Sequence, residues 1–143
     1  AAIGARHVGV RVSPFNGFND LAANFPGERE EYLALVDELG RRGLAYLSLI
    51  APPATVPADV VDETRRRFPG TLVLAGDYDA ARAEADLAAG RADLIAFGRP
   101  FVANPDLPER LRHGLPLAEF RADALFGGGA AGYTDYSAAA FTG

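Results

Sequence analysis

The sequence predicts an α/β fold built on a parallel sheet, and two observations carry this prediction. Short apolar segments rich in β-branched residues alternate four times with segments of helical periodicity, and no linker separates them. The chain has 143 residues and 49% hydrophobic content, which suits one buried core, so residues 1–143 are expected to form a single domain. Strands that alternate with helices imply parallel pairing and right-handed crossovers.

The expected strands are short and apolar, and the residues around them interrupt a sheet. The first ends before Pro14, whose missing N–H stops the hydrogen-bond ladder. The fourth, Asp93 to Phe97, is apolar between polar flanks, so we expect it to be buried on both faces. The four expected strands are residues 7–13, 44–50, 71–75 and 93–97.

The expected helices begin and end at typical capping residues. The first has an acidic start at residues 28–31 and a basic end at residues 41–43, which suits the helix dipole. Asp79 has the position of an N-cap, and Asp106 with Glu109 has the spacing of a capping box. The four expected helices are residues 28–42, 58–68, 79–89 and 106–112.

Four strand–helix units make half of a TIM barrel. A closed barrel of eight units takes about 250 residues, so this chain is too short for one, and its first and fourth strands should be open edges. Residues 1–6 have the pattern of the last turn of a helix, and position 1 is not Met. We therefore expect the chain to be the C-terminal half of something longer, with a parallel (βα)4 fold.

Composition narrows the class of partner. A net charge of −5 provides no basic patch, so nucleic acid and acidic membrane surfaces are not expected partners, and the substrate should be small. No apolar run approaches 18 residues and no signal peptide is visible, which predicts a cytoplasmic chain. The absence of Cys excludes thiolate catalysis, and two isolated histidines make a poor metal site.

The most informative motif follows the fourth strand, where Gly98 and Arg99 precede a helix start. Glycine lets a phosphate approach the backbone, and a guanidinium can bind it with two parallel hydrogen bonds. In a (βα) barrel this end of the strand faces the active site. The alternative is a tight turn with a solvated arginine, and spacing alone does not separate the two.

Three segments together resemble the old yellow enzyme family of FMN-dependent oxidoreductases, and are most similar to its bacterial alkene and nitroester reductases. They are residues 8–14 (Val-Gly-Val-Arg-Val-Ser-Pro), residues 93–107, which contain Phe-Gly-Arg, and residues 132–136 (Gly-Tyr-Thr-Asp-Tyr). The resemblance implies strands five to eight of the family barrel, with FMN over their carboxyl ends. It also implies NAD(P)H as reductant and an activated alkene or nitro compound as the electron-poor substrate.

The resemblance also implies the cofactor-binding residues. Arg11 matches an arginine beside the pyrimidine edge of the flavin, where a cation favours negative charge on the reduced ring. The alternative role for this arginine is a structural ion pair. Gly98 and Arg99 match one phosphate-binding segment, and Gly76 with Asp77 matches the other. An aspartate is unusual beside a phosphate, so we expect Asp77 to offer only its backbone N–H and to turn its carboxylate outward to cap the next helix.

Other positions depart from the family pattern. Phe126 stands where relatives carry a tyrosine over the flavin and the substrate, so a hydroxyl is lost. Asn19 matches a longer amide and is the second substrate-side candidate. Ser48 and Ala51 replace a histidine and an acidic residue that are frequent in the family. The resemblance places the substrate-activating residues on earlier strands, so this chain is not expected to be active alone.

Three hypotheses follow. The first is the FMN-binding portion of an ene-reductase or nitroester reductase that works with a missing N-terminal half barrel. The second is a non-catalytic truncated half barrel that pairs with a second copy of itself. The third is a generic binder of phosphate ligands, because a Gly-Arg strand end occurs in many barrels.

Overall fold

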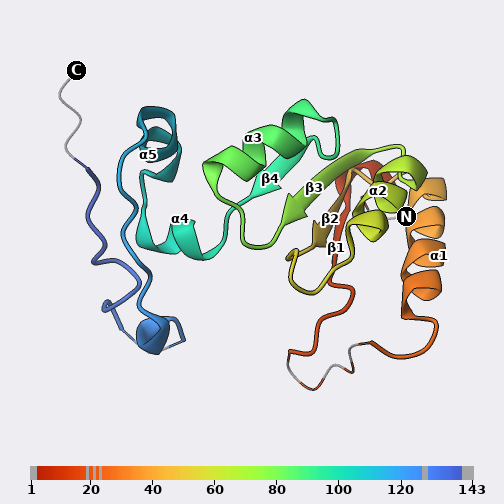
Figure 1. The fold of residues 1–143 in the computed structure, drawn as a ribbon, viewed down its shortest axis with the longest axis horizontal. Coiled ribbons are helices and arrows are strands. Elements are labelled where there is room, and N and C mark those ends of the chain that lie inside the picture. The colour runs from red at the N-terminus through yellow and green to blue at the C-terminus, as the bar shows by residue number, and fades with distance from the viewer. Residues whose placement is uncertain (1–2, 19, 21, 23, 127–128, 140–143) are drawn as a thin grey trace. The chain divides into compact units, whose positions relative to one another are not determined.

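A computed structural model of the chain describes residues 3–18, 20, 22, 24–126 and 129–139. Its contacts divide the chain into two compact units, Ala1–Ala96 and Phe97–Gly143. Figure 1 shows the order of the elements along the chain. Each unit is described separately below, and the expected single domain stays a prediction.

The first unit contains a parallel four-stranded sheet in the order β1-β2-β3-β4. The predicted strand order and helices are confirmed, with strands shorter than expected by up to three residues. Arg11, Ser48, Val73 and Leu94 are aligned across the sheet. The elements are η1 (Ala5–His7), β1 (Gly9–Val12), α1 (Glu28–Arg41), β2 (Tyr46–Ile50), α2 (Ala58–Arg67), β3 (Thr71–Ala75), α3 (Ala80–Ala88) and β4 (Leu94–Ala96). The expected helical turn at residues 1–6 is a 3-10 turn one residue later, and residues 1–2 lie outside the described chain.

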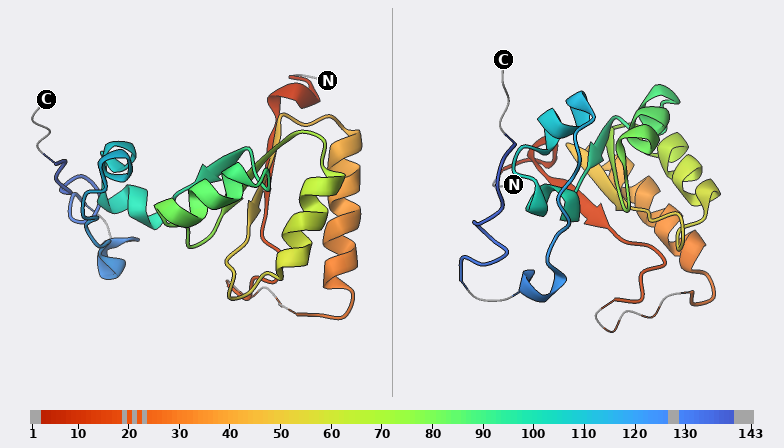
Figure 2. Two further views of the ribbon diagram at one scale, coloured as in Figure 1. Left: turned by 45° about the horizontal axis from the view of Figure 1, so that its top comes forward. Right: turned by 60° about the vertical axis from the view of Figure 1, so that its left-hand side comes forward.

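One face of the sheet carries the core. Helices α1 and α2 lie on that face (Figure 2). Alternate residues of the two central strands point there, because successive strand side chains face opposite sides. Apolar residues of the helices and of the turn after α2 cover these strand side chains and exclude water from them. The buried core of this layer includes Leu33, Val36, Leu47, Leu49, Val60, Phe68, Leu72 and Leu74.

The other face of the sheet is open. Tyr46 is 44% exposed and Leu94 is 56% exposed, although both are large apolar residues in strands. The expectation that strand 93–97 is buried on both faces is therefore wrong. Its apolar composition is typical of a strand that is buried on both faces. However, β4 pairs only with β3 among the described residues, and one of its faces has no covering layer within the first unit.

The second unit has little regular structure and is organised by polar side chains. Its elements are α4 (Arg99–Ala103), α5 (Leu107–His113) and η2 (Ala122–Ala124). Asn104 is fully buried, donates to the carbonyls of Pro100 and Ala118 at 2.8 and 3.1 Å, and accepts from the Ala118 N–H at 2.8 Å. One amide thus joins α4 to the segment after α5. Helix α4 was not expected, because five residues are too few to show a period.

The capping box expected at Asp106 does not form. Asp106 occupies the N-cap position of α5, but its side chain makes no capping hydrogen bond. Its carboxylate instead accepts from Arg110 Nε at 2.8 Å and from the Ala139 N–H at 2.6 Å. Glu109 pairs with Arg112 and does not reach back to the cap. Competition from a distant segment of the tail explains the difference, since that partner lies 33 residues away in sequence.

Candidate functional site

The carboxyl ends of parallel strands meet at one edge of the sheet, and two of the predicted site segments of the first unit lie at that edge. Arg11 is the third residue of β1, and Gly76 with Asp77 directly follows β3. The structure therefore places an arginine and a glycine turn at the edge where ligands bind in α/β folds.

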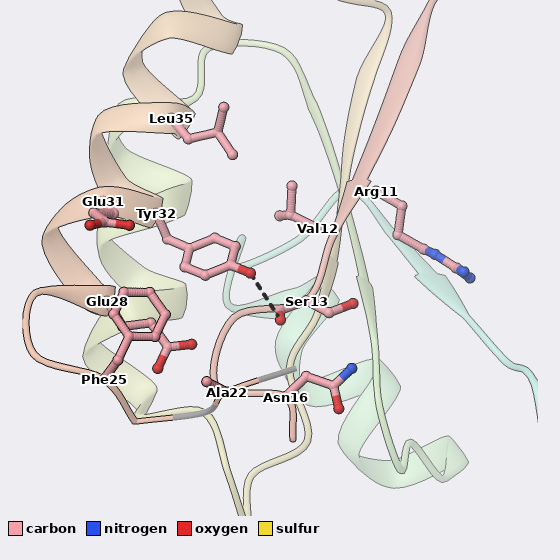
Figure 3. Close-up of a pocket in the computed structure, with 10 residues that line it drawn as sticks. All are labelled: Arg11, Val12, Ser13, Asn16, Ala22, Phe25, Glu28, Glu31, Tyr32 and Leu35. Atoms are coloured by element: carbon pink, nitrogen blue, oxygen red, sulfur yellow. Dashed lines mark hydrogen bonds between the residues drawn. The ribbon is translucent and has the colours of Figure 1, made fainter. Parts of the chain in front are cut away.

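Arg11 lies on the open face of the sheet. It extends away from Val12 and Tyr32, which are on the helix side of β1 (Figure 3). It lines an open groove of about 670 Å³ with Tyr46, Ser48, Val73, Leu94 and other residues of this face. Arg11 is exposed and makes no hydrogen bond or ion pair with any residue that the structure describes. The alternative role of Arg11 in a structural ion pair thus has no partner among those residues.

Gly76 and Asp77 form a turn with left-handed backbone. The φ angles are +118° at Gly76 and +52° at Asp77. A Cβ atom at Gly76 would lie 2.6 Å from the backbone nitrogen of Pro52, so a larger residue cannot fit without moving the loop after β2. Glycine is required here both by the angle and by this close approach.

Asp77 does not cap the next helix, so that part of the expectation is wrong. The Asp79 carboxylate caps α3 by accepting from the Arg82 N–H at 2.8 Å. Asp77 is exposed, and its positive φ is tolerated because Asp is among the few residues that adopt this conformation. The two acidic residues thus differ: Asp79 caps α3, whereas the side chain of Asp77, nearer to β3, is exposed to solvent.

The carbonyl groups of this turn face Arg82. Arg82 Nη1 donates to the Gly76 carbonyl at 2.7 Å and to the Asp77 carbonyl at 3.4 Å. In a trans peptide the N–H points opposite to the carbonyl, so the N–H groups of Asp77 and Tyr78 point away from the guanidinium. Neither N–H makes a hydrogen bond within the described part of the chain. Two adjacent unpaired N–H groups are a suitable anion site.

Gly98 and Arg99 belong to the second unit, so their geometry is separate from that of Arg11 and Gly76. Gly98 is the N-cap residue of α4, and a Cβ atom there would meet no other atom within 4 Å. Arg99 is exposed and lies 5.6 Å from the ring centre of Phe120. Among the described residues, the space at the Cβ position of Gly98 is therefore free, which would let a ligand approach the backbone there.

The substrate-side candidates have less structural definition. Phe126, also a cofactor candidate, is 88% exposed in the second unit. Asn19 lies outside the described residues. The roles assigned to these residues, and to Arg11, Gly76, Asp77, Gly98 and Arg99, stay predictions.

The structure adds a buried carboxylate that sequence reasoning missed. Glu28 is 3% exposed, and its two oxygens accept from the N–H groups of Phe15 and Asn24, each at 2.6 Å. It thereby ties both ends of the loop after β1, beside a pocket of about 510 Å³ in which Tyr32 also donates to the Ser13 carbonyl at 3.2 Å (Figure 3). From the sequence, the acidic residues at the start of α1 indicate only a favourable interaction with the helix dipole. No local pattern indicates that Glu28 binds the loop.

A second missed cluster lies behind the Gly76 turn. Tyr78 is buried and donates to Asp86 at 2.7 Å, and Arg82 lies over the Tyr78 ring at 3.9 Å. Burial and the hydrogen bond to Asp86 together raise the pKa of Tyr78 to about 12. In the sequence, Tyr78 precedes Asp86 by eight residues, across the start of α3. This spacing alone does not distinguish a contacting pair from polar residues on the exposed face of a helix.

Two further surveys concern the described residues only. They contain no cluster of three His, Asp or Glu side chains that could hold a metal ion. Among their helices, none has the length and apolar character needed to cross a bilayer.

The parallel sheet with its helices is that of half a TIM barrel, and comparison with known proteins gives the family. A sequence model described as NADH:flavin oxidoreductase / NADH oxidase family matches residues 1–118. The chain belongs to this family, and its resemblance to old yellow enzymes is confirmed. The family uses FMN and NAD(P)H.

Individual relatives support the same assignment. A 12-oxophytodienoate reductase-like protein of Solanum lycopersicum is 36% identical over 94% of this chain and 36% of its own length. Morphinone reductase in complex with tetrahydroNAD is 45% identical, with a TM-score of 0.82 over 92% of this chain and 36% of that one. The old yellow enzyme from Trypanosoma cruzi is 31% identical, with a TM-score of 0.85 over 96% of this chain and 36% of that one. The chain thus spans a little over a third of the length of these relatives.

Proposed function

We propose that this chain is the FMN-binding portion of an NAD(P)H:flavin oxidoreductase of the ene-reductase or nitroester reductase class. It would supply part of the FMN phosphate site and the arginine beside the flavin pyrimidine edge. The observation that carries the proposal is the Gly76–Tyr78 turn, which presents two unpaired N–H groups at the carboxyl edge of a sheet of this family.

The residues present are suited to FMN. The Asp77 and Tyr78 N–H groups would donate to phosphate oxygens. In the second unit, Gly98 and Arg99 are by themselves candidate phosphate donors through resemblance to the family. Arg11, which has no partner among the described residues, would be available to the ring and would favour negative charge on it. Bound FMN supplies hydride transfer between NAD(P)H and an electron-poor alkene or nitro compound.

A non-catalytic role is the second candidate, and the open sheet face favours it. The exposed Tyr46 and Leu94 lie on a face that has no covering layer within the first unit, and β1 and β4 are both edges of its sheet. Exposed edges and apolar faces promote association. Under this hypothesis the chain pairs with a second copy and binds no flavin.

Titration of the purified chain with FMN, and with riboflavin in parallel, tests the proposed function. Flavin fluorescence and visible absorbance report binding. We expect FMN to bind more tightly than riboflavin by at least roughly tenfold, since the phosphate accepts charge-assisted hydrogen bonds. A sugar phosphate that competes as well as FMN would instead support the generic phosphate binder.

Gly76→Ala and Gly90→Ala are the matched variants for this titration. Both glycines have positive φ, but a Cβ atom at Gly76 meets Pro52, whereas one at Gly90 meets nothing within 4 Å. We expect Gly76→Ala to lose the preference for FMN and Gly90→Ala to keep it. Equal binding of FMN and riboflavin by the folded wild-type chain would contradict the proposal.

A further inference from the structure

The loops after β2 and β3 are joined by one side chain, Arg82 of α3. In addition to the two carbonyls of the Gly76 turn, Arg82 Nη2 donates to the Ala51 carbonyl at 3.4 Å. A single guanidinium therefore contacts backbone oxygens on both sides of the close approach between Gly76 and Pro52. Arginine can do this because its planar group carries five N–H donors.

The guanidinium is itself held in place. It lies 3.9 Å from the centre of the Tyr78 ring, and its Nε is 3.9 Å from Asp86 Oδ2. Asp86 is 8% exposed and also binds the Tyr78 hydroxyl at 2.7 Å and Arg91 Nη1 at 3.2 Å. The backbone N–H of Arg82 donates to the Asp79 carboxylate that caps α3. Both the backbone and the charged end of Arg82 are thus fixed relative to the turn.

This arrangement selects one orientation of two peptide groups. If the Gly76–Asp77 peptide rotated by half a turn, its N–H would face the guanidinium, which has no acceptor atom, and its carbonyl would face the anion site. The same holds for the Asp77–Tyr78 peptide. Only the observed orientation gives the guanidinium acceptors and leaves both N–H groups available to an anion.

We propose that Arg82 is a positioning residue for phosphate binding, which orients the Asp77 and Tyr78 N–H groups without touching the ligand. The proposal rests on the proposed function, because it assumes that this turn receives the FMN phosphate. It assigns the orientation of the donors to the side chain of α3 rather than to the turn residues alone.

Arg82→Met and Arg91→Met are the matched variants. Both arginines contact Asp86, but Arg91 makes its other side-chain hydrogen bond to Asp62 and none to the turn. In parallel titrations we expect Arg82→Met to lower the preference for FMN over riboflavin by about tenfold, through FMN affinity alone, and Arg91→Met to keep it. An unchanged preference in folded Arg82→Met overturns the proposal.

Nuclear magnetic resonance of the Asp77 and Tyr78 amides separates this inference from the proposed function. In the ligand-free chain these two signals should move in Arg82→Met and stay in place in Arg91→Met. Inorganic phosphate should shift them in the wild type. A wild-type chain that binds neither FMN nor phosphate overturns the proposed function and the ligand role of the turn. Identical amide signals in wild type and Arg82→Met overturn the role of Arg82.

Arg82→Lys keeps the test decisive if Arg82→Met fails to fold. A lysine retains the charge but offers a single nitrogen in place of the planar fork of donors that contacts the carbonyls of Ala51 and Gly76. We expect it to preserve the fold and to show an intermediate preference for FMN, with shifted Asp77 and Tyr78 amides. Wild-type behaviour of Arg82→Lys in both measurements would mean that charge alone suffices, which contradicts positioning by the planar group.

Discussion

The phenol of Tyr78 illustrates how one buried residue links the candidate site to the solvent pH. Its hydroxyl donates to Asp86, and its ring supports the guanidinium of Arg82. Ionisation of this hydroxyl would remove the donor and place two negative charges together. Burial, and then the hydrogen bond to Asp86, therefore raise the pKa of Tyr78 to about 12 from an ordinary value of 10.0.

The pH dependence that follows has a definite sign. Between pH 10 and 12 the unfolded chain releases the Tyr78 proton while the folded chain keeps it, so the free energy of unfolding should fall as pH rises through this range. Below pH 10 this group should have no effect. An ultraviolet titration of tyrosinate should show a late ionisation in the wild type that is missing in Tyr78→Phe. If Tyr78→Phe instead lost an ionisation near the ordinary tyrosine pKa of 10.0, the assignment would be contradicted.

At the scale of elements, the two faces of the sheet have different energetic roles. Leu72 of β3 has no exposed surface and lies in the layer shared with the helices, whereas Leu94 of β4 is 56% exposed on the open face. Burial of a leucine stabilises the fold through transfer from water and through close packing. Two leucines in adjacent strands should therefore respond very differently to truncation.

Leu72→Ala should lower the free energy of unfolding by about 3 kcal/mol, because it removes apolar surface and leaves a cavity. Leu94→Ala should change it by less than about 0.5 kcal/mol, as expected for an exposed position. Denaturant unfolding followed by circular dichroism measures both. A large, concentration-dependent loss in Leu94→Ala would instead show that a second copy covers this face, and would favour the non-catalytic candidate.

For the whole molecule, the share of the relatives that this chain spans decides what activity to expect. It spans 36% of morphinone reductase, and Arg11 and the Gly76 turn would supply only cofactor contacts. Under the proposed function, the partner would be an N-terminal half barrel whose strands pair with the edges β1 and β4. We therefore expect this chain to bind flavin but not to catalyse the reaction alone.

We expect the chain with FMN and NAD(P)H to reduce no activated alkene by itself. Addition of the N-terminal part of a relative, such as morphinone reductase, should restore alkene-dependent oxidation of NAD(P)H, because the barrel closes. Light scattering should then report a one-to-one complex. The chain carrying Gly76→Ala serves as control and should gain less activity. Full turnover by the isolated chain would contradict the need for a second half.

The alternation of strands and helices could be predicted from the sequence, because short apolar segments rich in β-branched residues favour strands and a 3.6-residue period favours helices. The sequence by itself also determined local caps: Asp79 lies three residues from the N–H that it caps, so the contact is set by the chain itself. The alternation and the caps depend on neighbours along the chain. The role of Gly76 and Asp77 as a phosphate-binding segment rests on resemblance to the family and stays a prediction.

The tertiary structure alone decided which contacts distant residues make. Asp106 has the sequence of a cap but binds Arg110 and the Ala139 backbone, and apolar Leu94 lies on a face with no covering layer in its unit. Arg82 reaches the Ala51 carbonyl across 31 positions. A local pattern carries no information on such partners, because side-chain contacts between elements depend on how the sheet and helices pack. The sequence thus predicted the fold, and packing decided which backbone groups Arg82 contacts.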